Sequence, residues 1–372
     1  MVAATFLQGG GGQAQDLSED HREAISSIEK LGAKVTVKNA DGEISTEVFL
    51  SDSLCENLGT AFALLPHLPS CRVVTAYWAS VTDDEMEYLG ELRDLEVLKL
   101  SDAFTGRSSE ITDKGLRYLR HLTQLRTLSL ANTRITNKGL VQFRNLRKLE
   151  EIDISKTIVG NDGVVHLSQL VSLKTLDLSN TRIDDAGLIH IGKLRLLETL
   201  YLSGTQVSGT KFDKLHRLER LVDCELNATP VTDLTCRKLT GLKQLKRLSL
   251  NDTRITDDAC KQFVQLAHLE TLALDWTFVT DEGAKKVRQA LPQALIQIGT
   301  RLPDKDVAAI TRLLKSKHDF KGEILGMNFY DSGDVEVTTG ENVGFLSGQG
   351  LMFRLRKTND RWKVVERWSW VS

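Results

Sequence analysis

The stretch LVSLKTLDLSNTRIDDAGL, from Leu170 to Leu188, decides the fold of this chain. Its leucines follow the spacing Leu-x-x-Leu-x-x-Leu-x-Leu, and Thr181 closes that frame. Apolar and polar residues alternate from Thr175 to Ser179, which predicts a short strand with one buried face. After the threonine, apolar residues recur at helical spacing as far as Leu194, so this half of the stretch is predicted to be a short helix.

The same frame recurs along most of the chain. Its closing threonine stands at intervals of 24 residues, at Thr133, Thr157, Thr181, Thr205, Thr229, Thr253 and Thr277. A single repeat cannot bury both its strand face and its helix face, whereas stacked repeats share a continuous core. The pattern therefore predicts an α/β fold, a right-handed leucine-rich-repeat solenoid (horseshoe) with a parallel concave sheet and a helical convex side.

Two polar features of the repeat are predicted to be structural. The hydroxyl of each closing threonine can bond backbone groups of its own and the next repeat where the chain leaves the strand. The dipeptide Thr-Asp, or a close variant, follows a few residues later and marks the helix start. In the quoted repeat, Asp184 or Asp185 is expected to cap the helix by accepting a backbone N–H. We therefore assign these carboxylates neither to a metal nor to catalysis.

The frame sets the expected domain boundaries. Projected backward and forward, it opens about nine repeats between Leu68 and Leu266, so the array is predicted to span 68–300. Residues 18–67 are predicted to form an N-terminal cap, a helix plus strands around Asp41-Gly42. Residues 1–17 are expected to be a flexible segment. One repeat carries an insertion between Asp102 and Ile111, either a binding loop at the rim or a neutral surface loop.

Residues 301–372 lack the leucine period and predict a small α+β domain, a helix followed by antiparallel strands. Its sheet faintly resembles the curled sheets of cystatin-like and nuclear-transport-factor-like proteins. Trp362, Trp368 and Trp370 are the densest aromatic group in the chain. They are interpreted as core residues of a small sheet, and the alternative is a ligand-binding platform.

The array resembles the bacterial leucine-rich-repeat proteins that are abundant in planctomycetes, through RTLSLANTRITNKGL and KTLDLSNTRIDDAGL. It is also similar to the cysteine-containing repeat subclass of F-box adaptors, although FALLPHLP is too short to supply an F-box. The resemblance covers roughly three quarters of the chain. It implies the fold, and for function it implies contact with another protein.

Composition narrows the function further. The net charge of −2 argues against nucleic acid as the main partner, and no apolar run is long enough for a membrane span. Four of the five cysteines, Cys71, Cys224, Cys236 and Cys260, occupy apolar slots, and none has metal-ligand spacing. We predict no cofactor and no metal. Unpaired cysteines favour a cytoplasmic location, and the alternative is an exported form with a mis-assigned start.

The predicted binding surface is the concave face. Exposed strand positions hold carboxylates around Tyr201, namely Glu151, Asp153, Asp177, Asp223 and Glu225. Neighbouring strands lie about 4.8 Å apart, so this acidic zone favours a partner with a basic surface, and the alternative is an ordinary solvated face. Trp276 and Phe278 also face outward, either to bind a partner or to dock the C-terminal domain.

These observations predict a non-enzymatic protein–protein interaction scaffold of unknown oligomeric state. The main alternative is that the C-terminal α+β domain is a small-ligand-binding or enzymatic module that the solenoid positions. A third is an adaptor in a larger degradation or signalling assembly, against which the missing recruitment domain argues.

Overall fold

The computed structural model describes residues 17–40, 42–51, 54–77, 79–100, 110–299, 304–317, 323–329, 334–340, 349–358 and 361–371, and beyond 303 only some of the side chains. Strands β1 to β12 follow one another in sequence order in one sheet, and β13 to β16 form a second sheet. The described residues divide into two compact units, and the division falls between Asp177 and Leu178.

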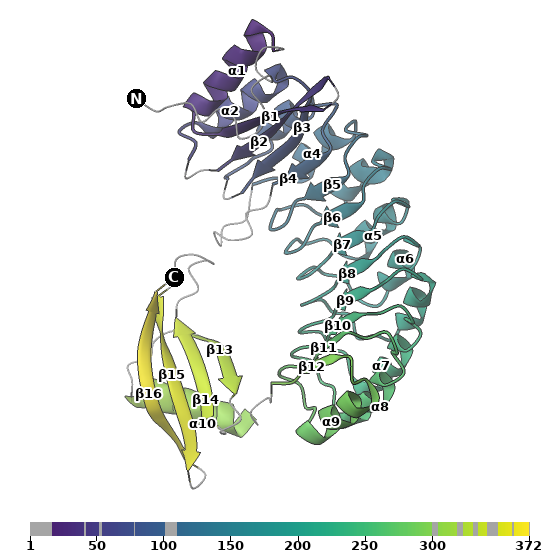
Figure 1. Cartoon of the computed structure of the whole chain (residues 1–372), viewed down its shortest axis with the longest axis vertical. Coiled ribbons are helices and arrows are strands. Elements are labelled where there is room, and N and C mark those ends of the chain that lie inside the picture. Colours follow the sequence, from purple (N-terminus) through teal and green to yellow (C-terminus); the bar gives the residue numbers. More distant parts are fainter. Residues whose placement is uncertain are drawn as a thin grey trace. The chain divides into compact units, whose positions relative to one another are not determined.

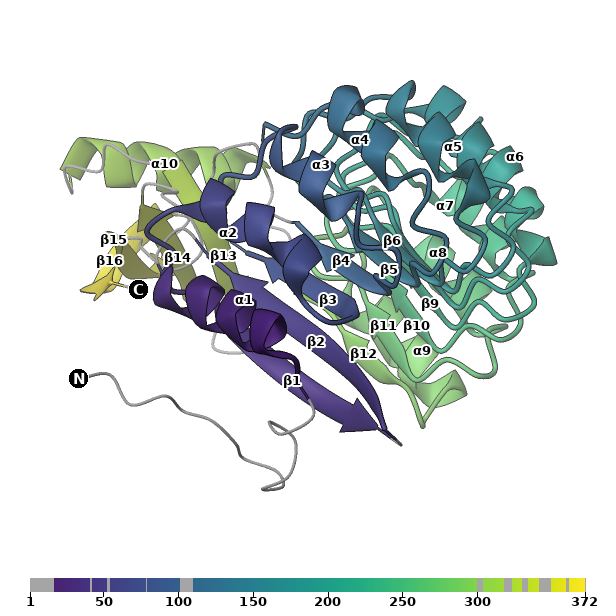
Figure 2. The ribbon, with the colours of Figure 1, turned by 90° about the horizontal axis from the view of Figure 1, so that it is seen from above.

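The first unit opens with the helix and the two strands that the sequence predicts. Helix α1 (Glu19–Lys30) begins where the Ser18 hydroxyl accepts the backbone N–H of His21 at 3.2 Å, and it ends before Gly32, whose φ is 99°. β1 (Lys34–Ala40) and β2 (Glu43–Leu50) then form an antiparallel hairpin, which Figure 2 shows beside α1.

Short parallel strands and helical segments alternate through the rest of this unit. In order they are α2 (Leu58–Leu64), η1 (Leu65–His67), β3 (Cys71–Ala76), α3 (Glu85–Leu89), β4 (Val97–Lys99), α4 (Asp113–Leu119), β5 (Thr127–Ser129), η2 (Gly139–Asn145), β6 (Glu151–Asp153), α5 (Asn161–Leu167) and β7 (Thr175–Asp177). Figure 1 shows the helices along one side of the strands. The predicted insertion between Asp102 and Ile111 lies outside the described residues, apart from Glu110.

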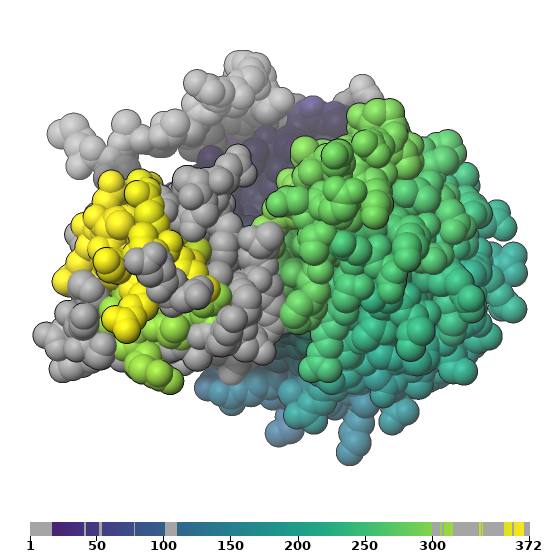
Figure 3. Space-filling model, turned by 90° about the horizontal axis from the view of Figure 1, so that it is seen from below, coloured from purple at the N-terminus to yellow at the C-terminus, as the bar shows by residue number. Residues whose placement is uncertain are grey.

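The second unit continues the same alternation. Its array elements are α6 (Leu188–Ile191), β8 (Thr199–Tyr201), η3 (Phe212–Arg217), β9 (Asp223–Glu225), α7 (Asp233–Leu239), β10 (Arg247–Ser249), α8 (Asp257–Phe263), β11 (Thr271–Ala273), α9 (Asp281–Ala290) and β12 (Leu295–Gln297). The parallel register places equivalent residues side by side, as Leu248 against Leu272. The frame leucines of these repeats are buried, so neighbouring repeats share a continuous core. Figure 3 shows the outer surface of this unit in teal and green.

The closing threonines form a buried ladder at the turn off each strand. Each hydroxyl donates to the carbonyl three residues earlier in its own repeat, as Thr253 Oγ1 does to Leu250 O at 2.6 Å. The predicted bond to the next repeat is made by the backbone instead, for example from Asp252 N to Asp275 O at 2.8 Å. The residue before each threonine has a positive φ, and these residues are Asn132, Lys156, Asn180, Gly204, Ala228, Asp252 and Trp276.

The Thr-Asp dipeptide does mark helix starts, but its two residues act differently from the prediction. Thr256 precedes α8 and accepts the N–H of Asp258, so the threonine is the cap. The aspartate reaches forward to the next repeat, where Asp257 accepts the N–H of Thr280 at 2.8 Å and its hydroxyl at 2.7 Å. In the repeat first quoted, Asp184 accepts the N–H of Ala186, whereas Asp185 bonds Ser208, Gly209 and Thr210.

The C-terminal segment is a helix and an antiparallel sheet, α10 (Asp304–Lys317) with β13 (Glu323–Phe329), β14 (Asp334–Gly340), β15 (Gln349–Thr358) and β16 (Arg361–Val371). Its core contains Ile310, Leu314, Val335, Val337, Phe353, Leu355 and Trp362. Asp306 fastens the helix to the sheet, because its carboxylate accepts the indole N–H of Trp362 at 3.1 Å and pairs with Lys357 at 3.0 Å. The predicted α/β solenoid with a small C-terminal antiparallel sheet is thus confirmed.

Candidate protein-binding surface

In the first unit, three carboxylates stand on the exposed side of β6 and β7. Glu151, Asp153 and Asp177 are each partly exposed, and Asp153 is the direct register partner of Asp177 on the neighbouring strand. Adjacent strands lie about 4.8 Å apart, so two like charges are held side by side. Such a pair attracts a cation, because the negative potentials of the two carboxylates add.

Neighbouring hydroxyls hold this group in place. Asp153 accepts hydrogen bonds from Ser129 Oγ at 2.9 Å, from Ser155 Oγ at 2.7 Å and from the backbone N–H of Ser155 at 3.0 Å. Glu151 accepts a longer bond from Thr127 Oγ1 at 3.4 Å. Three hydrogen bonds therefore fix the orientation of the Asp153 carboxylate on the exposed side of β6.

In the second unit, β8 and β9 carry Tyr201, Asp223 and Glu225. Tyr201 and Glu225 are register partners and both are partly exposed. Asp223 departs from the predicted exposure, because it is nearly buried and its Oδ2 lies 2.7 Å from Nε of Arg247 on β10. The bond to Asp223 raises the pKa of Arg247, and Asp223 in turn has a local counterion. Asp223 therefore adds less negative charge to this face than its residue type suggests.

Trp276 and Phe278 lie in the turn after β11 rather than on a strand. Trp276 is 38% exposed and has a φ of 63°, while Phe278 is 52% exposed. A left-handed backbone is unusual for a bulky residue, so Trp276 occupies a strained position that the other repeats fill with smaller or more flexible side chains. Both rings are accessible at the rim of the last array repeats.

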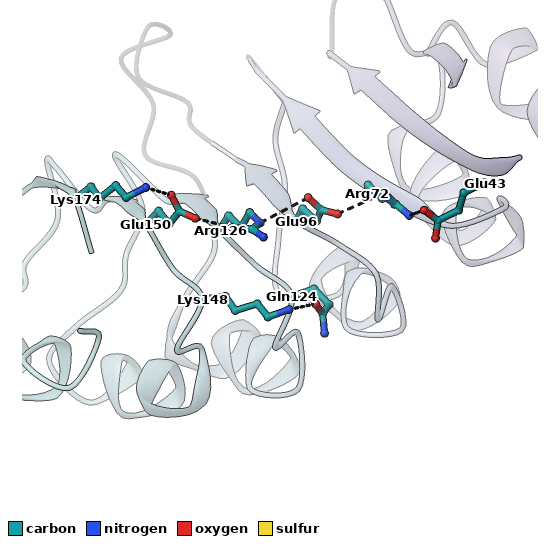
Figure 4. Close-up of polar contacts among 8 residues, drawn as sticks. All are labelled: Glu43, Arg72, Glu96, Gln124, Arg126, Lys148, Glu150 and Lys174. Carbon is teal, nitrogen blue, oxygen red and sulfur yellow. Dashed lines mark hydrogen bonds and ion pairs between the residues drawn. The ribbon is translucent and has the colours of Figure 1, made fainter. Parts of the chain in front are cut away.

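A ladder of alternating charges, which the sequence analysis missed, runs along the strand starts of the first unit (Figure 4). Its ion pairs join Arg72 to Glu43 (2.8 Å) and to Glu96 (3.7 Å), Arg126 to Glu96 (3.8 Å) and to Glu150 (2.5 Å), and Lys174 to Glu150 (2.6 Å). The signal was present in the sequence, because the residue after the second apolar position of each frame alternates in sign from Arg72 to Lys174.

The ladder sets the charge state of its central acid. Hydrogen bonds from Lys174 and then Arg126 lower the pKa of Glu150 below its ordinary value. The ladder therefore gives this edge of the strands a nearly balanced charge, in contrast to the acidic strand face of β6 and β7.

The cysteines have the predicted structural character. Burial raises the pKa of Cys71, Cys224 and Cys236 to about 12 and that of Cys260 to about 11. These thiols stay protonated at neutral pH and are poor nucleophiles. Among the described residues, no group of three or more His, Cys, Asp or Glu side chains could hold a metal ion.

The described part of the chain also contains no helix long and apolar enough to cross a membrane. The family model described as Leucine Rich repeat matches residues 169–192, which contain the stretch from Leu170 to Leu188. Together with the repeating strand and helix of each frame, this match supports a leucine-rich-repeat protein. The fold is that of an α/β leucine-rich-repeat solenoid.

Several solved structures are similar to the chain, and a search of curated proteins finds no match. A leucine-rich-repeat protein of Leptospira interrogans is 17% identical, over 64% of this chain and 68% of its own, with a TM-score of 0.44. Internalin C2 of Listeria monocytogenes is 25% identical, over 59% and 84%, with a TM-score of 0.42. The ectodomain of the Arabidopsis receptor kinase HAESA, solved in complex with an N-terminally extended IDA peptide hormone ligand, is 16% identical, over 76% of this chain and 47% of its own, with a TM-score of 0.48.

Proposed function

We propose that this chain is a non-enzymatic scaffold that binds another protein on the exposed strand face of its repeats, through a basic surface of that partner. The observation that carries the proposal is the pair Asp153 and Asp177, two carboxylates in register on adjacent strands. Asp153 is further held by three donors. Basic side chains of a partner would relieve the repulsion and gain charge-assisted hydrogen bonds.

Glu151 belongs to the same proposed surface. On the second unit, Tyr201 and Glu225 are proposed as further contacts, with Asp223 as a lesser contributor because of Arg247. Trp276 and Phe278 are proposed as apolar contacts of that unit, since exposed aromatic residues often dominate the binding energy of an interface. We further propose that the chain belongs with the bacterial repeat proteins whose pattern it resembles, and that its domains divide at residues 17, 67 and 300.

The alternative function, a ligand-binding or enzymatic C-terminal domain, gains no support from Trp362. That ring is buried in the domain core and its N–H is bonded to Asp306, so it does not offer an exposed platform. Trp368 and Trp370 lie among the residues whose side chains are not described.

The test compares capture of partners by the wild type with capture by two charge-reversed variants. The first is Asp153→Lys/Asp177→Lys on the strand face. The control is Glu23→Lys/Glu282→Lys, which makes the same change of charge on the exposed sides of α1 and α9. Circular dichroism first establishes that both variants keep the fold.

A protein that binds the wild type and the control but not the strand-face variant supports the proposal. Its binding should also weaken with added salt, because screening reduces charge attraction at an exposed surface. Equal binding by all three forms would place the interaction elsewhere and contradict the proposal. A Glu225→Lys variant then tests whether the second unit takes part.

A further inference from the structure

The first strand of the sheet, β1, has one edge paired and one edge open. It pairs with β2 in an unbroken antiparallel register from Lys34↔Phe49 to Ala40↔Glu43. Within the described residues no strand pairs with its other side, since β1 is the end of the strand order. In Figure 2 it lies at the outer margin of the sheet, next to β2 and beneath α1.

The backbone groups that face this open edge can be identified. In an antiparallel pair, opposed residues alternate between those that bond each other and those whose backbone groups point apart. Thr46 lies opposite Val37 but donates its N–H to Ser70 O, on the far side of β2, at 3.1 Å. The backbone N–H and C=O of Val37 therefore point away from β2, and those of Val35 do likewise, two residues away.

The edge is suitable for the addition of a further strand. β1 has seven residues, no proline and no bulge, whereas each array strand from β4 to β12 has three residues. Side chains along β1 alternate between exposed and partly buried, so the strand has one face toward α1 and one toward solvent. An open edge of this length offers main-chain hydrogen bonds to any extended segment that approaches it.

Charge on the exposed face of β1 specifies what kind of segment fits. Lys38 pairs with Glu47 of β2 at 2.6 Å, Glu43 of β2 pairs with Arg72, and the alternation then continues through the ladder to Lys174. Neighbouring strands in this series thus carry side chains of opposite charge. β1 is the positively charged strand at one end of the series. Lys34 stands on the same face as Lys38, is exposed, and makes no ion pair with the described residues.

We propose that the open edge of β1 binds an extended acidic peptide segment of a partner protein, which adds as a further strand and continues the alternation of charge. Outward N–H and C=O groups of β1, including those of Val35 and Val37, would pair with the peptide backbone. Acidic side chains at every second position would face Lys34 and Lys38. This surface is separate from the acidic strand face, so the inference does not depend on the function proposed above.

The test uses the synthetic peptide ETEVETE, labelled for fluorescence anisotropy, and its basic counterpart KTKVKTK. Two variants of the whole chain alter the edge. Val37→Pro removes an outward N–H that makes no bond to β2, and Lys34→Glu reverses an exposed charge. Their matched controls are Val37→Thr, which keeps the N–H, and Lys114→Glu, which reverses an exposed lysine on α4.

We expect ETEVETE to bind the wild type and both controls, and to bind Val37→Pro at least about tenfold more weakly, through the lost hydrogen bond and the clash of the ring. Lys34→Glu should weaken binding about fivefold, and high salt should weaken it further. KTKVKTK should bind the wild type less tightly than ETEVETE.

Three outcomes would overturn the proposal. The first is that ETEVETE fails to bind at millimolar concentration, and the second is that it binds both edge variants as well as the wild type. The third is that sedimentation shows a wild-type dimer that Val37→Pro converts to monomer, because a second copy of the chain would then occupy the edge.

Discussion

Asp257 accepts two hydrogen bonds from Thr280, one from its backbone N–H and one from its hydroxyl, although the two residues belong to successive repeats. The same arrangement joins Asp83 to Thr112, Asp113 to Thr136 and Asp233 to Thr256. In each pair, the aspartate near the start of one helix thus fixes the threonine that precedes the next helix. The Thr-Asp motif is therefore a connection between repeats as well as a helix signal.

The first prediction concerns the glycine of the Thr-Asp-x-Gly pattern. A Cβ on Gly283 would come within 2.1 Å of Asp257 Oδ1, and Asp257 cannot move away without losing its bonds to Thr280. Gly283→Ala should lower the free energy of unfolding by about 1–3 kcal/mol, as overpacking does. Urea denaturation measures the effect.

Gly59→Ala is the matched control for that change. A Cβ there meets its nearest atom, Glu85 Oε1, at 3.5 Å, which is an ordinary contact. Gly59 also lies in a helix, so alanine should stabilise the protein by up to about 1 kcal/mol. Equal effects of the two substitutions would show that the aspartate does not limit the glycine position.

The second prediction concerns the threonine ladder. Thr253→Val keeps the shape of the side chain but leaves Leu250 O without the hydroxyl donor at a fully buried turn. We expect a loss of about 1–3 kcal/mol in unfolding free energy. Thr240→Val removes a comparable bond to Arg237 O in a more exposed position and should cost far less. A loss at Thr253 no greater than at Thr240 would contradict a structural role for the ladder.

The third prediction is a pH dependence at Glu150. The pKa of this carboxyl is lower in the folded state, because Lys174 and Arg126 bond its ionised form. Its contribution to stability is then present above its unfolded pKa, ordinarily 4.5, and is lost as the pH falls through the lower folded value. Glu150→Gln should therefore lower the melting temperature at pH 7 and have little effect at strongly acidic pH.

Salt provides an independent check on that interpretation. The ladder is partly exposed, so added salt should reduce the melting-temperature difference between wild type and Glu150→Gln at pH 7. A difference that stays constant with both pH and salt would indicate that packing, not charge, explains the effect.

Much of this fold could be predicted from the sequence, and the limits of the prediction have a common cause. The strand and helix of each repeat follow from local periodicity, so the repeating frame and the buried threonines were accessible without a structure. The contact between Asp257 and Thr280 could not be predicted from the sequence. Thr280 lies 23 residues from Asp257 and meets it only after the repeats stack in register. The same holds for the candidate site, where Arg247 neutralises Asp223 from the neighbouring strand.

The fourth prediction concerns the contact between α10 and the C-terminal sheet. Asp306 is buried and pairs with Lys357 while it accepts the N–H of Trp362. Asp306→Asn would leave Lys357 without its counterion in a partly buried position, and we expect a loss of about 3 kcal/mol. Tryptophan fluorescence, to which Trp362 of this domain contributes, follows the unfolding. Glu366→Gln, in an exposed pair with Arg354, should change the midpoint little, and a similar shift for both would contradict the assignment.

The fifth prediction concerns the left-handed turn before each threonine. Ala228 has a φ of 52° there and its side chain is exposed, whereas two equivalent positions hold Asn132 and Asn180. A left-handed residue with a Cβ costs about 1–2 kcal/mol, and asparagine tolerates this conformation better than alanine. Ala228→Asn should therefore raise the free energy of unfolding by about 0.5–1 kcal/mol, measured in urea, while Ala259→Gly inside helix α8 should lower it by about 1 kcal/mol. A destabilised Ala228→Asn would mean that the turn is held by its contacts with the next repeat and not by the preference of the residue itself.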